Sequence, residues 1–194
     1  MRRRRSVSAL RAAFVAASAA WAVILPLAPY LASRPHASPA GTAFVVAVYG
    51  IGGLICHQLP ERSYRLWTAQ MPVCARCAGI YFGAAIAAIA LAAAPLKRRP
   101  ANDAAAPLKR RPTYEGLAVV GHRLSGANAN ASRDTLIISA LPTLLTLVYE
   151  WTTGHMPANG IRFAAGAPIG VAVAWLVIRH AHDDRRAHPE PVEG

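Results

Sequence analysis

The sequence predicts an all-α membrane protein, a polytopic bundle of about five transmembrane helices with a disordered basic loop. Hydrophobic residues make up 54% of its 194 residues and charged residues only 15%, whereas a soluble domain usually carries about 25% charged residues. The charges are also clumped, because Asp, Glu, Lys and Arg are all absent from residues 12–33, 35–60 and 77–96. Each of these runs is long enough for the ~20 apolar residues that cross a bilayer as a helix.

Two further uncharged runs complete the pattern. They cover residues 135–149 and 163–178, which is 15 and 16 residues, so a helix built on either must borrow polar residues at its ends. A water-soluble bundle would show a polar face in every helix, and the first run is longer than the roughly 7–15 apolar residues of a cleaved signal peptide. The helices are therefore expected at about residues 11–32, 42–59, 73–95, 134–151 and 160–179.

Polar segments separate these helices. They divide the chain into a basic N-terminus (1–10), helices one to three with a Cys/His motif (11–96), a disordered basic loop (97–133), helices four and five (134–179) and a disordered tail (180–194). The string AAAPLKRRP occurs twice, at 92–100, where helix three gives way to the loop, and at 104–112 within the loop. A 12-residue period is too short for a solenoid unit of roughly 20–50 residues.

The net charge of +12 is carried mainly by these polar segments. Between membrane spans, Lys and Arg set the topology and contact anionic lipids. The expected partner is therefore the lipid bilayer, with anionic-lipid contacts from the basic loop and both termini, and nucleic acid is not expected.

Alternation of the spans predicts where the unusual residues meet. The end of helix two, the start of three, the end of four and the start of five share one membrane face. The opposite face is expected to hold the short 33–41 loop and the basic loop. Glu150 and Arg162 bound the two short runs, so they are drawn to the interface, where pairing offsets the cost of burying a charge. We expect them to contact each other, or either to pair with Arg62 or Arg76, the alternative being that each extends into the headgroups.

All three cysteines lie on this predicted face. Cys74 and Cys77 form a C-x-x-C in the first turns of helix three, where the helix N-terminus and Arg76 favour a thiolate. Cys56 adjoins His57, and the four residues form a Cys₃His set suited to Zn or Fe, although neighbours such as Cys56 and His57 can point apart. His155 is a second candidate for the fourth position. A redox pair of Cys74 and Cys77, or plain packing of small thiols, are the alternatives.

Two further groups of residues are expected to support this face. Those that would orient the ligands or bind an anionic ligand are Gln58, Arg62, Ser63, Arg76, Glu150, Asn159 and Arg162. Those that would pack helix three closely against helix five are Gly79, Gly83, Gly166 and Gly170, which form two G-x-x-x-G motifs.

The strings CHQLPERS and PVCARCAGIYFG resemble the signature of a bacterial integral-membrane family, domain-of-unknown-function family 2085. The resemblance continues through Pro142, Glu150, Asn159, Arg162, Gly166 and Gly170, and it covers roughly residues 50–95 and 135–178. Ala78 departs from the family pattern, which usually has Thr, and Glu150 departs where many members show Asp. The resemblance implies a membrane fold and supports the same site, but it implies no reaction.

Three functions are compatible with these observations. The first is a multi-pass protein of the bacterial inner membrane with a metal site at Cys56, His57, Cys74 and Cys77. The second is a membrane thiol-disulfide oxidoreductase that uses Cys74 and Cys77, and the third is a small transporter or channel subunit. Segments rich in Lys and Arg are usually cytoplasmic. With five crossings, however, Arg2–Arg5 and the basic loop fall on opposite faces of the membrane, so these two signals conflict. The N-terminal arginines favour a cytoplasmic cysteine face.

Overall fold

The computed structural model describes residues 2–36, 38–93 and 114–187. Its elements, in chain order, are the helices α1 (Arg2–Ala32) and α2 (Pro39–Ile55), a 3₁₀ turn (Pro60–Arg62), the strands β1 (Arg65–Leu66) and β2 (Ala69–Gln70), and the helices α3 (Ala75–Ala93), α4 (Tyr114–Thr153) and α5 (Asn159–Ala187). The two short strands form an antiparallel hairpin that precedes α3.

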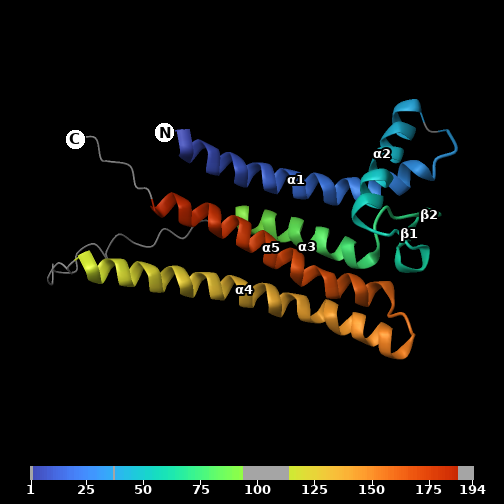
Figure 1. Cartoon of the computed structure of the whole chain (residues 1–194). Coiled ribbons are helices and arrows are strands. Elements are labelled where there is room, and N and C mark those ends of the chain that lie inside the picture. Colours follow the sequence, from blue (N-terminus) through green and yellow to red (C-terminus); the bar gives the residue numbers. More distant parts are fainter. Residues whose placement is uncertain (1, 37, 94–113, 188–194) are drawn as a thin grey trace.

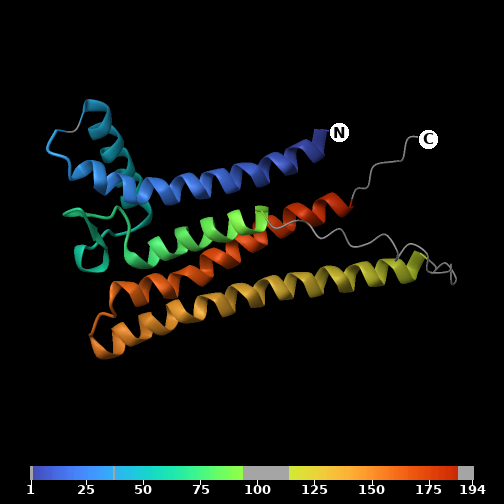
Figure 2. The same cartoon turned by 180° about the vertical axis from the view of Figure 1, so that it is seen from behind.

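Four of the described helices are long and apolar enough to cross a membrane, and they confirm the expected polytopic bundle. The candidate spans are Ala9–Ala32, Ala75–Ala93, Asn130–Thr153 and Asn159–His180. The four helices that contain them, α1, α3, α4 and α5, run alongside one another in both views (Figures 1 and 2).

The helix α2 differs from the other four in length and direction. It has 17 residues, and it stands across the direction of the bundle at one end (Figures 1 and 2). The end of α1 lies at the same end of the bundle, because the rings of Tyr30 and Trp67 meet edge to face with centroids 5.3 Å apart. The expectation that the 33–41 loop lies opposite the cysteines is therefore wrong, because α2 does not return along α1.

The four long helices give the bundle two chemically different ends. The cysteine end, as we call it, comprises the end of α2, the hairpin, the start of α3, the end of α4 and the start of α5. At the basic end, α1 begins, α3 ends, α4 begins and α5 ends (Figure 1), and Arg11 Nη2 donates to the carbonyl of Leu91 at 3.0 Å. Sixteen of the 21 Lys and Arg residues belong to three sequence segments, 2–11, 97–133 and 179–186. The first begins α1, the second connects α3 to the apolar part of α4, and the third ends α5.

Glycines bring α3 and α5 into close contact, as the two G-x-x-x-G motifs predict. A Cβ added to Gly79 would lie 2.0 Å from the carbonyl oxygen of Phe163, and one added to Gly170 would lie 1.9 Å from that of Ile80. Gly83 and Gly166 meet backbone of the opposite helix in the same way, at 2.4 and 2.2 Å. This close approach fixes the start of α3, with its cysteines, against the start of α5.

Three helices extend beyond their expected bounds. α1 includes the segment expected as a separate basic N-terminus, α4 begins at Tyr114, and α5 continues to Ala187. Part of the expected basic loop, 114–133, is thus helical, and no proline occurs between Pro112 and Pro142 to interrupt it. Residues 97–113 of that loop and 188–194 of the tail lie outside the described residues.

Candidate functional site

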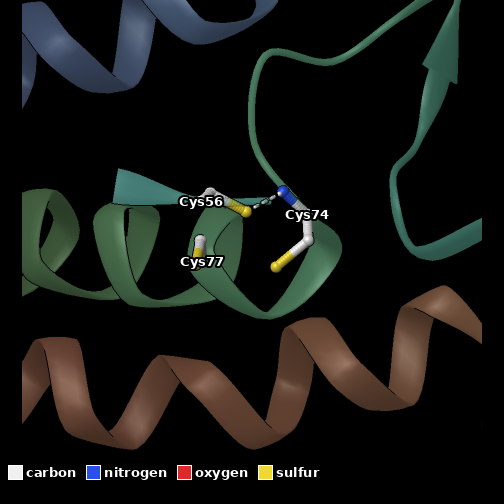
Figure 3. Close-up of side chains that lie close together, drawn as sticks. All are labelled: Cys56, Cys74 and Cys77. Atoms are coloured by element: carbon white, nitrogen blue, oxygen red, sulfur yellow. Dashed lines mark hydrogen bonds between the residues drawn. The ribbon is translucent and has the colours of Figure 1, made fainter. Parts of the chain in front are cut away.

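The three thiols gather where α2 ends and α3 begins. Cys56 caps the end of α2, where its N–H donates to the carbonyl of Gly52 at 2.9 Å. Cys74 directly precedes α3, and Cys77 lies in its first turn, so the two cysteines of the C-x-x-C share one side of the helix start. All three Sγ atoms lie within 4.8 Å of one another (Figure 3).

A backbone donor meets the sulfur of Cys56, because the N–H of Cys74 donates to it at 3.2 Å (Figure 3). The pKa of the Cys56 thiol is held well below its usual value, first by the hydrogen bonds from the Cys74 and Cys77 side chains and then by nearby backbone groups, while burial opposes the shift. The surroundings therefore favour a thiolate at Cys56, the form that binds metals and attacks disulfides.

The spacing of the sulfurs suits a thiophilic metal ion. A Zn–S bond is about 2.3 Å long, so sulfurs on a tetrahedral zinc lie about 3.8 Å apart. The three sulfurs, all within 4.8 Å of one another, need only small shifts to reach that separation. The arrangement can therefore supply three ligands, and it leaves a fourth position for another group.

The histidines lie outside this group of ligand atoms. His57 is exposed, and the group of Sγ atoms within 4.8 Å does not include its ring. His155 is also exposed, in the turn between α4 and α5, where its Nδ1 lies 2.9 Å from the carbonyl oxygen of Thr153. Neither ring joins the three sulfurs, and His57 as the fourth ligand stays a prediction.

Gln58 ties the end of α2 to the segment that carries Cys74. It has a positive φ of 50°, and its Nε2 donates to the carbonyls of Tyr49 at 2.8 Å and Pro72 at 2.7 Å. Gly52 permits this approach, because an added Cβ would lie 2.1 Å from the Pro72 oxygen. Gln58 therefore holds together the two segments that bring Cys56 and Cys74 together.

A second connection joins the 3₁₀ turn to α5. Ser63 is buried, and its Oγ donates to the carbonyl of Leu59 at 3.0 Å. Its own carbonyl accepts a hydrogen bond from Asn159 Nδ2 at 3.2 Å. Both residues were expected to support the site, and these contacts fix the turn against the start of α5.

A pocket of about 350 Å³ opens beside the thiols. All three cysteines line it, together with the three arginines Arg62, Arg76 and Arg162. Its remaining wall is formed by Ile55, His57, Gln58 and Leu59. Any ion held by the sulfurs would therefore have its fourth position near guanidinium groups.

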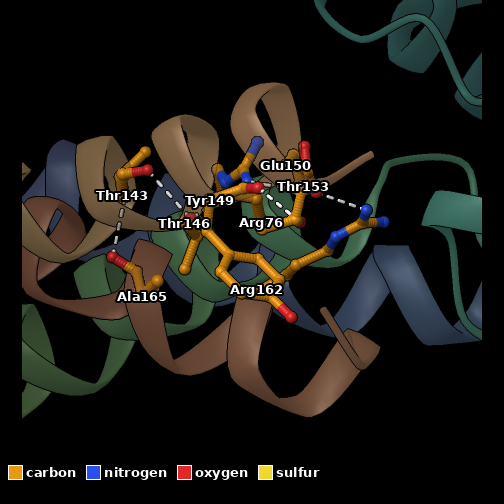
Figure 4. A network of polar contacts seen from close by, with 8 residues as sticks. All are labelled: Arg76, Thr143, Thr146, Tyr149, Glu150, Thr153, Arg162 and Ala165. Atoms are coloured by element: carbon orange, nitrogen blue, oxygen red, sulfur yellow. Dashed lines mark hydrogen bonds and ion pairs between the residues drawn. The ribbon is translucent and has the colours of Figure 1, made fainter. Parts of the chain in front are cut away.

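Glu150 is the carboxylate at the centre of the neighbouring charged network. It is 8% exposed and makes an ion pair with Arg162, which is 2% exposed, so the predicted contact of these two residues is present. Arg76 Nη2 lies 3.7 Å from the same Glu150 oxygen and donates to Thr146 Oγ1 at 3.0 Å (Figure 4). The network lies at the cysteine end of α4 and α5 rather than at the middle of a span.

Several residues that hold the site together were not predicted. The Tyr49 hydroxyl donates to the carbonyl of Gln70, and Gln70 Nε2 donates to the carbonyl of Gln58 at 2.5 Å. Thr143 Oγ1 donates to the carbonyl of Ala165 at 2.8 Å and joins α4 to α5 (Figure 4). The only signal for Tyr49 and Thr143 is a polar side chain within an apolar run, since such groups need partners, and Gln70 lies in no such run.

Comparison with known proteins supports the family resemblance. The model of the family described as "Predicted membrane protein (DUF2085)" matches residues 56–108, which include all three cysteines. An uncharacterised protein of Methanocaldococcus jannaschii is 41% identical over 63 residues, and this match covers 32% of the chain and 40% of that protein. The chain therefore spans less than half the length of this relative.

A second relative covers more of the chain. An uncharacterised protein of Methanothermobacter thermautotrophicus is 28% identical over 131 residues, 65% of the chain and 88% of that protein. Both relatives are archaeal, so they do not point to a bacterial source. No solved structure matches the chain.

Proposed function

We propose that this chain is an integral protein of a prokaryotic plasma membrane that holds a thiophilic metal ion, Zn²⁺ in the first instance, between Cys56, Cys74 and Cys77. The observation that carries the proposal is the mutual approach of three Sγ atoms to within 4.8 Å. Sulfur ligands select zinc, copper(I) and iron–sulfur chemistry over hard cations such as Mg²⁺. The hydrogen bond to Cys56 from the backbone N–H of Cys74 suits a bound thiolate and orients it.

The number of ligands suggests what kind of metal site this is. Structural zinc sites are closed by four protein ligands, whereas catalytic zinc sites have three and keep a fourth position for water or substrate. Three sulfurs beside a pocket of about 350 Å³ fit the second kind. The metal would then act on a small molecule that enters from the membrane surface.

The distribution of charge supports an orientation in which the metal site faces away from the cytoplasm. Cytoplasmic segments of membrane proteins carry an excess of Lys and Arg, and sixteen of the 21 such residues belong to the sequence segments 2–11, 97–133 and 179–186. With four crossings, the N-terminal arginines and the basic loop fall on the same side, so the conflict in a five-crossing count disappears. The five-crossing count favoured a cytoplasmic location for the cysteines. Our proposal instead puts them on the side of the membrane that faces away from the cytoplasm.

Cobalt(II) titration tests the metal site directly. Cobalt bound by three thiolates in a tetrahedral site gives intense visible bands and a thiolate-to-metal charge-transfer band in the near ultraviolet. The full chain in an uncharged detergent is expected to show both at about one equivalent of cobalt. Cys56→Ser, which removes one sulfur, should weaken the charge-transfer band, and wild-type protein that shows no such band would refute the site.

Thiol-disulfide exchange is the second candidate, and two observations favour it. A third thiol lies within reach of the Cys74–Cys77 pair, and the proposed orientation puts all three in an oxidising compartment, where disulfides persist. Oxidation of the pair would transfer two electrons and two protons to a partner disulfide, which becomes a dithiol. Alkylation of thiols in intact cells separates the candidates, because a metal site keeps all three cysteines reduced and a redox site does not.

A further inference from the structure

The pocket beside the thiols contains more positive than negative charge. Arg62, Arg76 and Arg162 all line it. Among the described residues, the ion pairs of Arg76 and Arg162 both run to a single carboxylate, Glu150. Arg162 is 2% exposed, and a buried charge is normally paired. Two of the three positive charges therefore have no counter-charge among the residues that the structure describes.

The hydrogen-bonding groups of these arginines are also incompletely used. Within the described residues, four buried nitrogen atoms have no hydrogen-bond partner, namely Arg62 Nε, Arg76 Nε, Arg162 Nε and Arg162 Nη1. Buried donors in folded proteins are almost always satisfied by protein, by ordered water or by a bound ion. Unpaired donors on all three arginines of one pocket indicate an acceptor that the described part of the chain does not provide.

We propose that this pocket binds a phosphate-type oxyanion, either free in solution or as the headgroup of an anionic lipid. A guanidinium group is planar and presents paired donors that match the oxygens of a phosphate. A volume of about 350 Å³ accommodates such a group. The anion would accept hydrogen bonds from the guanidinium groups that line the pocket and neutralise the positive charge that Glu150 leaves uncompensated.

The wall of the pocket suits an anion that carries an apolar part. Ile55 and Leu59 line it and are 52% and 38% exposed. The pocket also lies at the ends of membrane-spanning helices, at the level where lipid headgroups are found. A free phosphate and a phospholipid headgroup present the same oxygens to the arginines, and the apolar wall would contact the remainder of a lipid.

The anion site does not depend on the metal. A divalent ion with three thiolates carries a net charge of about −1, which offsets only one of the two uncompensated arginine charges. The arginines are therefore expected to attract an anion whether or not the sulfurs hold an ion.

Calorimetric titration of the full chain in an uncharged detergent tests the proposal. One arm uses inorganic phosphate and the other uses short-chain phosphatidylglycerol, both at fixed ionic strength. Saturable binding of phosphate supports the site with a free anion as ligand, and binding of the lipid alone supports it with a headgroup as ligand. No saturable binding in either arm overturns the proposal.

Matched arginine variants show whether the binding is local. Arg62→Gln is expected to weaken the affinity about tenfold or more, because it removes a charge-assisted donor. Arg65→Gln removes an exposed charge nearby that does not line the pocket, and it should leave the affinity unchanged. Equal losses in both variants would mean diffuse surface attraction and would overturn the proposal.

A serine variant separates the anion site from the metal site. The triple variant Cys56→Ser, Cys74→Ser, Cys77→Ser cannot bind a thiophilic ion but keeps the three arginines. It is expected to bind phosphate or phosphatidylglycerol as the wild type does, provided that size-exclusion chromatography shows it folded. Loss of binding in the folded variant would contradict an arginine site that is independent of the metal.

Discussion

The backbone N–H of Cys74 donates to the sulfur of Cys56 at 3.2 Å, although 18 positions of sequence separate the two residues. The contact joins the end of a helix that stands across the bundle to the start of one that runs along it. Because both segments are also held by Gln58, the protein brings the sulfurs together through its own hydrogen bonds. These hydrogen bonds hold the segments that carry Cys56 and Cys74, and such support lowers the ordering that binding of an ion would require.

The ligand set can be tested by comparing cysteine and histidine variants. Loss of a hydrogen bond to a metal ligand lowers metal affinity roughly 10–100-fold. Cys77→Ser removes a ligand itself, so it is expected to weaken zinc binding by more than that. His57→Ala should leave the affinity unchanged, because the His57 ring is outside the group of sulfurs. Competition with a chromophoric zinc chelator measures both affinities. A loss in His57→Ala as large as that in Cys77→Ser would instead make His57 the fourth ligand.

The pair of Glu150 and Arg162 is expected to contribute strongly to stability. Glu150→Gln leaves the buried Arg162 without its carboxylate, and removal of one partner of a buried pair costs about 3–5 kcal/mol. Unfolding in detergent, followed by circular dichroism, measures the change in the free energy of unfolding. Glu61→Gln is the control, because Glu61 is exposed, and equal stability of the two variants would contradict the role of the pair.

The packing of α3 against α5 predicts different results for two glycines of α5. An added Cβ at Gly170 would lie 1.9 Å from the Ile80 oxygen, whereas at Gly160 it meets nothing within 4 Å. Gly170→Ala should therefore destabilise the fold by about 1–3 kcal/mol. Gly160→Ala should be neutral or slightly stabilising, since Ala favours helix. Thermal unfolding in detergent compares them, and a neutral Gly170→Ala would rule out the close approach of the helices.

Sidedness can be measured with an impermeant maleimide in a cysteine-free background. Thr68→Cys adds a thiol to the exposed turn of the hairpin, at the cysteine end. Ser6→Cys adds one near the start of α1, at the basic end. The first is expected to react in intact cells, and the second only after lysis. The reverse pattern would place the metal site in the cytoplasm.

The features that the sequence predicted correctly depend on local chemistry. Glycines four residues apart indicated the close contact of α3 with α5, and two charges at the ends of short apolar runs indicated the Glu150–Arg162 pair. Convergence of the cysteines was predicted from five alternating spans; α2 is not among the four candidate spans, but its end still lies beside the start of α3 (Figure 1). The glycine and charge inferences hold because each depends on residues within one helix or at its ends.

The direction of α2 could not be read from the sequence. Residues 35–60 form an uncharged run long enough to span a bilayer, but the helix occupies only 17 of them. Residues 56–59 after it are held by hydrogen bonds to Gln70, Pro72 and Cys74, and these contacts fix the end of α2. Composition carries no signal for such contacts.

The position of His57 illustrates a second limit. Cys56 is extended, with φ −147° and ψ 138°, and successive side chains of an extended chain point to opposite sides. The His57 ring is outside the group of three sulfurs in this structure, although it lines the same pocket, and His57 as the fourth ligand stays a prediction. The hairpin was not predicted either, because its turn residues Trp67 and Thr68 have positive φ but are not the Asn or Gly that usually indicate such a turn.

The central claim is that three thiolates of one chain hold one metal ion. Elemental analysis of the full chain, purified in detergent without chelators, tests it most directly when wild type and the triple variant Cys56→Ser, Cys74→Ser, Cys77→Ser are compared. The account predicts about one zinc or other thiophilic ion per wild-type chain and none in the variant. Less than about 0.2 ion per wild-type chain, or equal amounts in both proteins, would contradict it.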